Sequence, residues 1–251
     1  MPLRSLPAMR NLGMLSAWIG LVLATSALAA EMSEERKRLI GQIQAEVLAT
    51  AGELGFARLS PAVEAALLKV ERHAFVPAPR RDLAYLNSPL PIGSGQTISQ
   101  PYIVAIMSQL LGVGPGDKVF ELGTGSGYQA AILAAMGVEV YTVEIVPELA
   151  EQASKTLASL GYDRVHVRSG DGWQGWPEAA PFDGIIVTAA APRIPQPLVD
   201  QLAADGRLVI PMGAPDRIQQ LALFSKDEHG ALVRENLLPV RFVPVTGAMG
   251  Q

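Results

Sequence analysis

The pattern of hydrophobic positions predicts a helical N-terminal part followed by alternating strands and helices. Between residues 33 and 55, apolar residues recur at helical spacing on a charged background, which predicts an amphipathic helix. Ser60 and Pro61 predict the start of a second helix reaching about Val70, because serine caps helices and proline fits the first helical position. Repeated prolines and glycines over 75–100 predict a long loop without a regular element, and such loops are often functional.

From residue 100 onward, short hydrophobic runs alternate with helical patterns. The runs predict strands over 118–122, 138–144, 164–168, 183–188 and 206–212, with helices over 101–111, 127–136, 147–160 and 195–204. This alternation indicates a parallel sheet covered on both faces. Two more strands, 217–226 and 231–245 around a turn at 227–230, predict an antiparallel hairpin at the sheet edge. The predicted fold class is α/β: a doubly wound, mostly parallel sheet with N-terminal helices and an antiparallel C-terminal hairpin. Ligands of such sheets bind beyond the carboxyl ends of the strands.

The first 30 residues have the order of a secretory signal peptide. Two arginines and no acid accompany an apolar run over 12–23, and small residues follow up to Ala30. The run is too short to span a bilayer comfortably. No repeat or linker divides the rest, so we expect a signal peptide over 1–30 and a single domain over 31–251. A start at Met32 would begin a soluble protein equally well, which leaves a cytoplasmic location as the alternative to a periplasmic or secreted one.

Charge and composition exclude several kinds of site. The 251 residues hold 20 basic and 24 acidic side chains, a net charge of −4, and removal of the two arginines in 1–30 makes it −6. Because no bulk positive field is present, nucleic acid is not an expected partner. The absence of cysteine excludes disulfides, thiolate metal sites and a cysteine nucleophile. The three histidines are too scattered to suggest metal-ligand spacing, so no metal is expected.

A glycine turn follows the strand predicted over 118–122. Gly123, Gly125 and Gly127 precede a predicted helix, and glycines there allow positive φ and let a ligand approach the backbone closely. A plain tight turn is the alternative explanation of these glycines when they are taken alone. Tyr128 stands where a dinucleotide fingerprint requires a further glycine, which disfavours an NAD oxidoreductase.

Two acids follow the next two strands. Glu144 ends the strand over 138–144, faces the same crevice as Glu121 and can accept both hydroxyls of a ribose. Asp171, between Gly170 and Gly172, can accept a hydrogen bond from an adenine amino group. Each acid alone also fits a solvated strand end or a turn. Together they describe a nucleoside cleft, and S-adenosylmethionine fits it because an acidic cleft favours its sulfonium.

The segment 89–102, PLPIGSGQTISQPY, followed by ELGTGSGY at 121–128, closely resembles the protein-L-isoaspartate O-methyltransferases. The agreement covers essentially residues 33–247. The part over 95–101 is highly specific to this family, whereas the glycine turn marks only a class I methyltransferase with a Rossmann-like sheet. The resemblance implies methyl transfer from S-adenosylmethionine to the free α-carboxylate of L-isoaspartyl residues in damaged proteins and peptides. The ester then collapses to a succinimide, whose hydrolysis repairs part of the backbone.

The resemblance also implies roles for single residues. Ser99 would be the active-site residue, with Gln96, Thr97 and Ile98 beside it binding substrate. The implied cofactor contacts are Glu121, Gly123, Thr124, Gly125, Gly127, Glu144, Asp171 and Gly172. From its position alone, Ser99 is also a candidate cap for the helix over 101–111. No Ser/His/Asp set is needed, because a carboxylate is already ionised and nucleophilic at neutral pH.

Two other classes of function stay open at this point. An exported relative could bind S-adenosylmethionine without turnover, since this compound is made in the cytoplasm. A class I methyltransferase acting on a small molecule is the second, and it would be expected to close its cleft with a lid. We expect a monomer that has no membrane partner once the signal is removed.

Overall fold

The computed structural model describes residues 12–214, 217–227 and 229–247, with side chains from Glu31 onward. Contacts divide the chain into two compact units with their boundary between Arg38 and Leu39, inside helix α1 (Leu12–Ala49). In the first unit, Lys37 Nζ lies 2.7 Å from Glu34 Oε1. The predicted signal peptide lies outside the residues whose side chains are described. Within the described part of the chain, none of the helices is long and apolar enough to cross a membrane.

The second unit begins with the end of α1 and four short helices. These are α2 (Ala51–Leu54), α3 (Pro61–Lys69) and the 3₁₀ helices η1 (Arg72–Phe75) and η2 (Ala78–Leu83). As predicted, Ser60 caps α3, because its Oγ accepts from the Val63 N–H at 3.3 Å and Pro61 follows it. The helix expected over 33–55 is interrupted at Thr50, so its last turn forms the separate α2.

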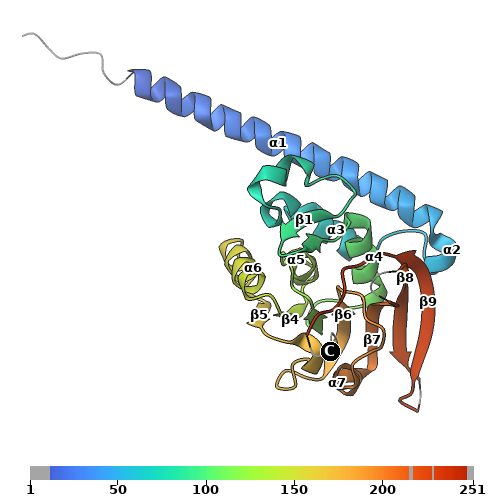
Figure 1. The fold of residues 1–251 in the computed structure, drawn as a ribbon. Helices are drawn as coiled ribbons and strands as arrows, with labels where there is room; N and C mark the ends of the chain where they lie inside the picture. The colour runs from blue at the N-terminus through green and yellow to red at the C-terminus, as the bar shows by residue number, and fades with distance from the viewer. Residues whose placement is uncertain (1–11, 215–216, 228, 248–251) are drawn as a thin grey trace, which may run out of the picture. The chain divides into compact units, whose positions relative to one another are not determined.

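The seven-stranded sheet confirms the predicted fold class (Figure 1). Its order is β5-β4-β3-β6-β7-β8-β9, parallel from β5 to β7 and antiparallel beyond. The strands are β3 (Lys118–Leu122), β4 (Glu139–Glu144), β5 (Val165–Ser169), β6 (Phe182–Val187), β7 (Leu202–Met212), β8 (Gln219–Lys226) and β9 (Leu232–Val240). The helices between them are α4 (Pro101–Leu111), α5 (Tyr128–Ala135), α6 (Pro147–Ser159), the 3₁₀ helix η3 (Gly172–Gln174) and α7 (Gln196–Gln201).

The sheet is buried because helices pack against its strands. Helix α6 contacts β4 and β5, and α4 contacts β6 and β7. Phe120, Phe182 and Ile185 are consequently fully buried between the layers. The chain order reverses at β3, which has β4 and β5 on one side and β6 on the other. A ligand crevice is expected at this switch point, beyond the carboxyl ends of β3 and β6.

The segment over 75–100 contains a regular element that the sequence did not predict. Strands β1 (Leu90–Gly93) and β2 (Gln96–Ile98) form a small antiparallel sheet. Ser94 and Gly95, with φ of 50° and 72°, reverse the chain tightly between them. Proline is tolerated here because a two-stranded sheet leaves one side of each strand without a ladder partner.

Two predicted boundaries near the C-terminus are wrong. The helix expected over 195–204 ends at Gln201, because Leu202 already pairs with Phe182 of β6. The strand expected to reach residue 245 ends at Val240, and the chain leaves the sheet to pair with Ala190. The Ala190 N–H donates to the Val243 carbonyl at 2.8 Å, and the Val245 N–H donates to the Ala190 carbonyl at 2.9 Å. We call residues 241–247 the C-terminal strap.

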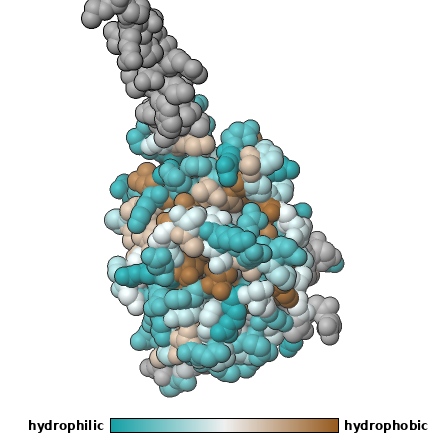
Figure 2. Space-filling model, turned by 90° about the vertical axis from the view of Figure 1, so that its left-hand side faces the viewer, coloured by the Kyte–Doolittle hydropathy of each residue, from teal (hydrophilic) through white to brown (hydrophobic). Residues whose placement is uncertain are grey.

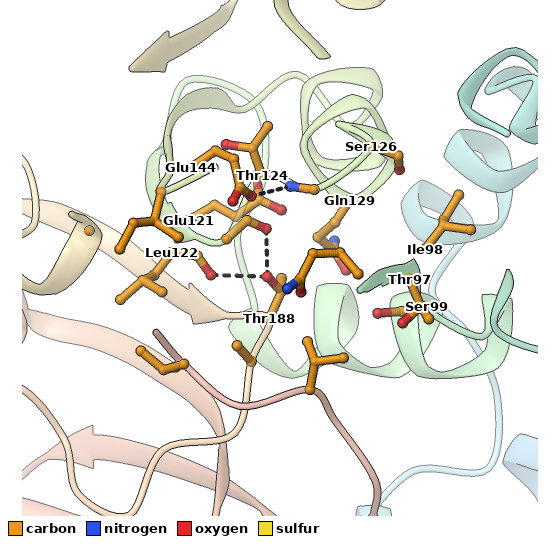
Figure 3. A pocket seen from close by; sticks show the side chains of 18 of the residues that line it. Thr97, Ile98, Ser99, Glu121, Leu122, Thr124, Ser126, Gln129, Glu144 and Thr188 are labelled. Atoms are coloured by element: carbon orange, nitrogen blue, oxygen red, sulfur yellow. Dashed lines mark hydrogen bonds between the residues drawn. The ribbon is translucent and has the colours of Figure 1, made fainter. Parts of the chain in front are cut away.

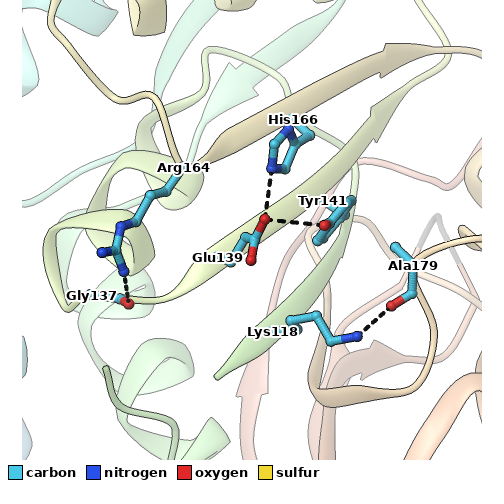
Figure 4. Close-up of polar contacts among 7 residues, drawn as sticks. All are labelled: Lys118, Gly137, Glu139, Tyr141, Arg164, His166 and Ala179. Atoms are coloured by element: carbon cyan, nitrogen blue, oxygen red, sulfur yellow. Dashed lines mark hydrogen bonds and ion pairs between the residues drawn. The ribbon is translucent and has the colours of Figure 1, made fainter. Parts of the chain in front are cut away.

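A polar cluster joins β4 and β5 at the amino ends of the strands, opposite the crevice (Figure 4). Glu139 Oε1 lies 3.0 Å from His166 Nε2 and accepts from the Tyr141 hydroxyl at 3.1 Å. Both contacts lower the pKa of Glu139, and the contact with His166 has the larger effect. Because the pair is more than a third exposed to solvent, its contribution to stability is small.

Candidate functional site

A crevice opens beyond the carboxyl ends of β3, β4 and β6 (Figure 3). Besides Val104 of α4 and Gly172 of η3, five segments that are distant in the sequence form its walls. They are residues 96–99, the glycine turn with the start of α5, residues 143–145, residues 188–189 and the strap residues 243–246. The predicted switch point is therefore where these segments meet.

Ten of the twelve residues predicted for the site line this crevice. They are Gln96, Thr97, Ile98, Ser99, Glu121, Gly123, Thr124, Gly125, Glu144 and Gly172. The other two, Gly127 and Asp171, lie beside it. Gly127 is the N-cap of α5, and the Asp171 carboxylate caps η3 by accepting from the Trp173 N–H at 3.0 Å. The strap lies against Asp171, because a Cβ on Gly247 would be 2.8 Å from Asp171 Oδ2.

The glycine turn is held in place by a threonine that the sequence did not single out. The Thr188 hydroxyl lies 2.9 Å from the Leu122 carbonyl oxygen and 2.6 Å from that of Gly123. Gly123 has φ of 97°, and a Cβ there would lie 2.4 Å from Thr188 Oγ1. Because neither the backbone conformation nor the space suits a side chain, the turn requires glycine at this position.

Glu144 is nearly buried and has a fixed orientation. Its Oε2 accepts from the Gly125 N–H at 2.8 Å, and its Oε1 accepts from the Val146 N–H at 3.0 Å. Each carboxylate oxygen keeps a further acceptor position. The side chain can therefore receive two hydroxyl groups from a ligand in the crevice, as a ribose requires.

Glu121 is fully buried, and neither of its carboxyl oxygens has a hydrogen-bond partner in the described structure. Burial raises its pKa to about 8; the nearby Glu144 adds to the rise and the Thr142 hydroxyl opposes it. The Thr142 hydroxyl is hydrogen-bonded to Thr124 Oγ1, at 2.6 Å, and not to the Glu121 carboxyl. An isolated buried carboxyl that lines a crevice is a group that a cationic ligand would stabilise in its ionised form.

These features together fit a nucleoside that carries a positive charge. The glycine turn allows close approach of the ligand, Glu144 offers hydroxyl acceptors, and Glu121 offers a buried carboxyl. S-adenosylmethionine meets all three requirements. Across the described residues, His, Cys, Asp and Glu do not gather into a group of three that could hold a metal.

Ser99 does not have the capping role that its position suggested. The N-cap of α4 is Gln100, and the Tyr102 N–H is satisfied by Asn87 Oδ1 at 3.0 Å. Figure 3 shows Ser99 on the wall of the crevice formed by the segment after β2. No hydrogen bond engages its hydroxyl within the described part of the chain, so it is available to a ligand.

Gln129 is a crevice residue that sequence reasoning missed. The Ser108 hydroxyl donates to the Val104 carbonyl at 2.8 Å, so Ser108 Oγ accepts from Gln129 Nε2 at 2.7 Å. This arrangement fixes the side-chain amide and leaves its carbonyl oxygen for the crevice (Figure 3). A buried polar residue in the otherwise apolar α5 was the available signal.

Arg72 anchors the residues that lead into the β1–β2 hairpin, and Ser99 follows this hairpin. Arg72 is fully buried; its Nε donates to the Ala84 carbonyl at 2.8 Å and its Nη2 to the Ser88 carbonyl at 3.2 Å. The guanidinium also lies 5.1 Å from the centre of the Tyr128 ring, at the start of α5. Burial lowers its pKa to about 10, so the side chain stays protonated at neutral pH.

Comparison with known proteins gives consistent matches. Residues 44–250 match the model of the family described as Protein-L-isoaspartate(D-aspartate) O-methyltransferase. A protein-L-isoaspartate O-methyltransferase of Gloeobacter violaceus is 60% identical over 185 residues, which cover 74% of this chain and 90% of that protein.

Two solved structures are also similar. One, a protein-L-isoaspartate O-methyltransferase, has a TM-score of 0.71 and 27% identity and covers 82% of this chain and 67% of its own. The other, from Plasmodium falciparum and assigned to the same class, was solved with S-adenosyl-L-homocysteine. It has a TM-score of 0.65 and 25% identity, covering 80% of this chain and 97% of its own.

Proposed function

This chain belongs to the protein-L-isoaspartate(D-aspartate) O-methyltransferase family, and from that premise we propose how its crevice performs the reaction. The protein is an S-adenosylmethionine-dependent carboxyl methyltransferase that acts on L-isoaspartyl residues. The observation that carries the proposal for the site is the meeting of Glu121, Glu144 and Ser99 at one crevice.

The chemistry requires positioning more than acid or base catalysis. When bound, S-adenosylmethionine supplies an electrophilic methyl group on a sulfonium. The substrate α-carboxylate is ionised at neutral pH, so no side chain has to remove a proton. The crevice has to hold the carboxylate oxygen in line with the methyl carbon and the sulfur and keep bulk water out. Such alignment can lower the barrier by several kcal/mol.

We assign the inner part of the crevice to the cofactor. Glu121 would lie beside its positive charge, and Glu144 would accept the two ribose hydroxyls. The turn over 123–125 would approach it through backbone atoms. Asp171 would accept from the adenine amino group at the corner where Gly247 of the strap lies close to that carboxylate.

We assign the outer part to the peptide. The Ser99 hydroxyl would donate to the substrate α-carboxylate, and Gln96, Thr97 and Ile98 would border the isoaspartyl residue. The support is that these four residues line the crevice beside α4 while the Ser99 hydroxyl is unused.

Replacing Ser99 with alanine tests this role. We expect turnover of an isoaspartyl peptide to fall about 10- to 100-fold, because one orienting hydrogen bond is lost in the transition state. The affinity for S-adenosylmethionine should not change. Transfer of labelled methyl measures turnover, calorimetry measures binding, and Ser159→Ala, on the surface of α6, is the matched control.

Three outcomes of this assay would contradict the proposal. Full turnover by Ser99→Ala would remove Ser99 from the site. Equal labelling of the matching aspartyl peptide by the wild type would contradict isoaspartate repair. Cofactor binding without transfer to either peptide would favour a binding protein without turnover.

We further propose that residues 1–30 are a signal peptide and that 31–251 form the single methyltransferase domain. The order of arginines, apolar run and small residues supports export to the periplasm or beyond. The cytoplasmic origin of S-adenosylmethionine supports the alternative of a cytoplasmic enzyme. Mass spectrometry of the mature N-terminus decides between them: export predicts a start near Ala30, and a start at Met1 or Met32 contradicts it.

The enzyme is also proposed to work as a monomer on polypeptides, without a nucleic acid or membrane partner. Its acidic net charge gives no general attraction for polyanions. The face in Figure 2 is mostly hydrophilic, with hydrophobic residues gathered in small areas. That face offers no extended apolar surface of the kind that stable dimers bury.

A further inference from the structure

A second cavity opens directly beside Ser99 and continues the outer part of the crevice. It shares Thr97, Ser99, Thr188 and Val243 with the crevice. We call it the flanking groove, and its other lining residues are Pro89, Gln100, Ile103, Ile218, Pro239, Val240, Arg241 and Phe242. The groove thus joins the segment that carries Ser99 to the end of β9 and the C-terminal strap.

The lining of the groove is mostly apolar, and part of it is open to solvent. Ile218, just before β8, is 63% exposed although it is a large aliphatic residue. Ile103 and Phe242 add further apolar surface at the groove. An exposed aliphatic residue at the edge of an apolar cavity gains favourable contacts when another apolar side chain covers it.

Arg241 is the charged residue among those that line the described groove. It is exposed, and it makes no ion pair or hydrogen bond with any residue in the described part of the chain. No acidic side chain lines the described groove. The groove therefore complements a ligand that carries both an apolar and an anionic group.

The chemistry of the substrate brings such a ligand to this place. When the α-carboxylate of an isoaspartyl residue lies at Ser99, the polypeptide continues in two directions from the same residue. Its amide nitrogen leads to the preceding residue, and its side-chain carbonyl leads to the following one. Cα atoms across the preceding peptide bond are only about 4 Å apart, and the isoaspartyl link adds a single methylene before the following residue. A side chain on either neighbour therefore falls within reach of a cavity that also contains Ser99.

We propose that the flanking groove binds the residues next to the isoaspartyl residue and selects an apolar side chain together with an acidic one. Ile218 and Phe242 would cover the apolar side chain, and Arg241 would pair with the carboxylate. This inference rests on the proposed function, since it takes the isoaspartyl residue to lie at Ser99. It makes Arg241 a residue that determines specificity among damaged sequences.

The test compares short synthetic isoaspartyl peptides that differ only beside the modified residue. In one set leucine-glutamate, leucine-lysine or glycine-glutamate follows the isoaspartate, and in a second set the same pair precedes it. For the wild type we expect kcat/KM to be about three- to fivefold higher with glutamate than with lysine in at least one set. In that same set, the leucine-glutamate peptide should have a higher kcat/KM than the glycine-glutamate peptide.

The variant Arg241→Glu should reverse the order of the glutamate and lysine peptides, because the charge at the groove is inverted. Arg234→Glu, an exposed arginine of β9 outside the groove lining, makes the same change in net charge and should keep the wild-type order. Circular dichroism and thermal melting verify that both variants are folded.

The proposal is overturned if the wild type shows no preference in either set, if Arg241→Glu keeps the wild-type order, or if both variants change it equally. These results differ from failure of the proposed function. If the function itself fails, no isoaspartyl peptide is methylated, although the protein still binds S-adenosylmethionine. If the groove alone fails, all the peptides are methylated at similar rates.

Discussion

Glu121→Gln is expected to abolish a pH dependence of stability and to weaken cofactor binding at the same time. Both effects arise because the carboxyl is fully buried and lacks a hydrogen-bond partner among the described residues. In the ligand-free protein its pKa is raised from the ordinary 4.5 to about 8, so it carries a proton at neutral pH. Glutamine resembles this neutral form but cannot ionise.

The direction of the stability effect follows from proton binding. Between pH 4.5 and 8 the folded protein holds a proton on Glu121 that the unfolded chain has released. The free energy of unfolding therefore falls by up to about 1.4 kcal/mol per pH unit as the pH rises, and levels off above pH 8. From pH 5 to 8 this amounts to about 3 to 4 kcal/mol in the wild type. In Glu121→Gln the free energy of unfolding should not show this fall with rising pH.

Cofactor binding should show the opposite dependence. A cationic ligand beside Glu121 favours the ionised carboxylate, so binding releases a proton below pH 8. The affinity of the wild type for S-adenosylmethionine is expected to rise by up to about tenfold per pH unit until the pH reaches about 8. Glu121→Gln should bind more weakly at pH 8 and should lose the part of the pH dependence that comes from Glu121.

Urea unfolding and titration calorimetry at several pH values measure the two effects. Glu139→Gln is the matched control, since Glu139 is half exposed, lies away from the crevice and has a lowered pKa. Its contribution to stability is present at neutral pH and is lost as the pH falls below about 4.5. If the wild type and Glu121→Gln keep the same pH dependence in both measurements, Glu121 does not have the proposed role.

Arg72→Met is expected to destabilise the protein by about 3 kcal/mol and to lower turnover. Methionine fills similar space but donates no hydrogen bond, so the carbonyl groups of Ala84 and Ser88 lose their partners. Hydrogen bonds from a charged donor contribute about 1.5 to 3 kcal/mol each, and the removal of a buried unpaired charge offsets part of that loss. Because these bonds hold the start of the β1–β2 hairpin that Ser99 follows, we expect turnover to fall about tenfold, with a smaller effect on cofactor affinity.

The urea midpoint and single-turnover methyl transfer check this expectation. Arg72→Lys should be intermediate, because a lysine keeps the charge but its single ammonium group does not span both carbonyls as the planar guanidinium does. Arg80→Met, on the exposed surface of η2, should change neither measurement. An unchanged midpoint for Arg72→Met would show that the arginine does not anchor this segment.

The sequence determined the elements whose stability is local. Hydrophobic runs predicted β3 and β4 nearly to the residue, and the helical pattern over 101–111 predicted α4 with its observed bounds. The spacing of the glycine turn, Glu144 and Asp171 along successive strands predicted the edge of the sheet where a nucleoside would bind. The inferences about strands, helices and turns are confirmed because strand burial, helix caps and glycine turns depend on neighbours in the chain, whereas the nucleoside site stays a prediction.

Only the tertiary structure decided which distant groups meet. The pairing of the strap with Ala190, the Thr188 contact that holds the glycine turn, and the Asn87 contact with the Tyr102 N–H at the start of α4 all join segments that are not adjacent in the sequence. The missing partner of Glu121 and the unmatched charge of Arg241 likewise depend on what surrounds each side chain in space. A sequence pattern specifies which groups are present and on which element they lie. Burial and long-range packing then determine their hydrogen bonds, their pKa values and the ligand that they can hold.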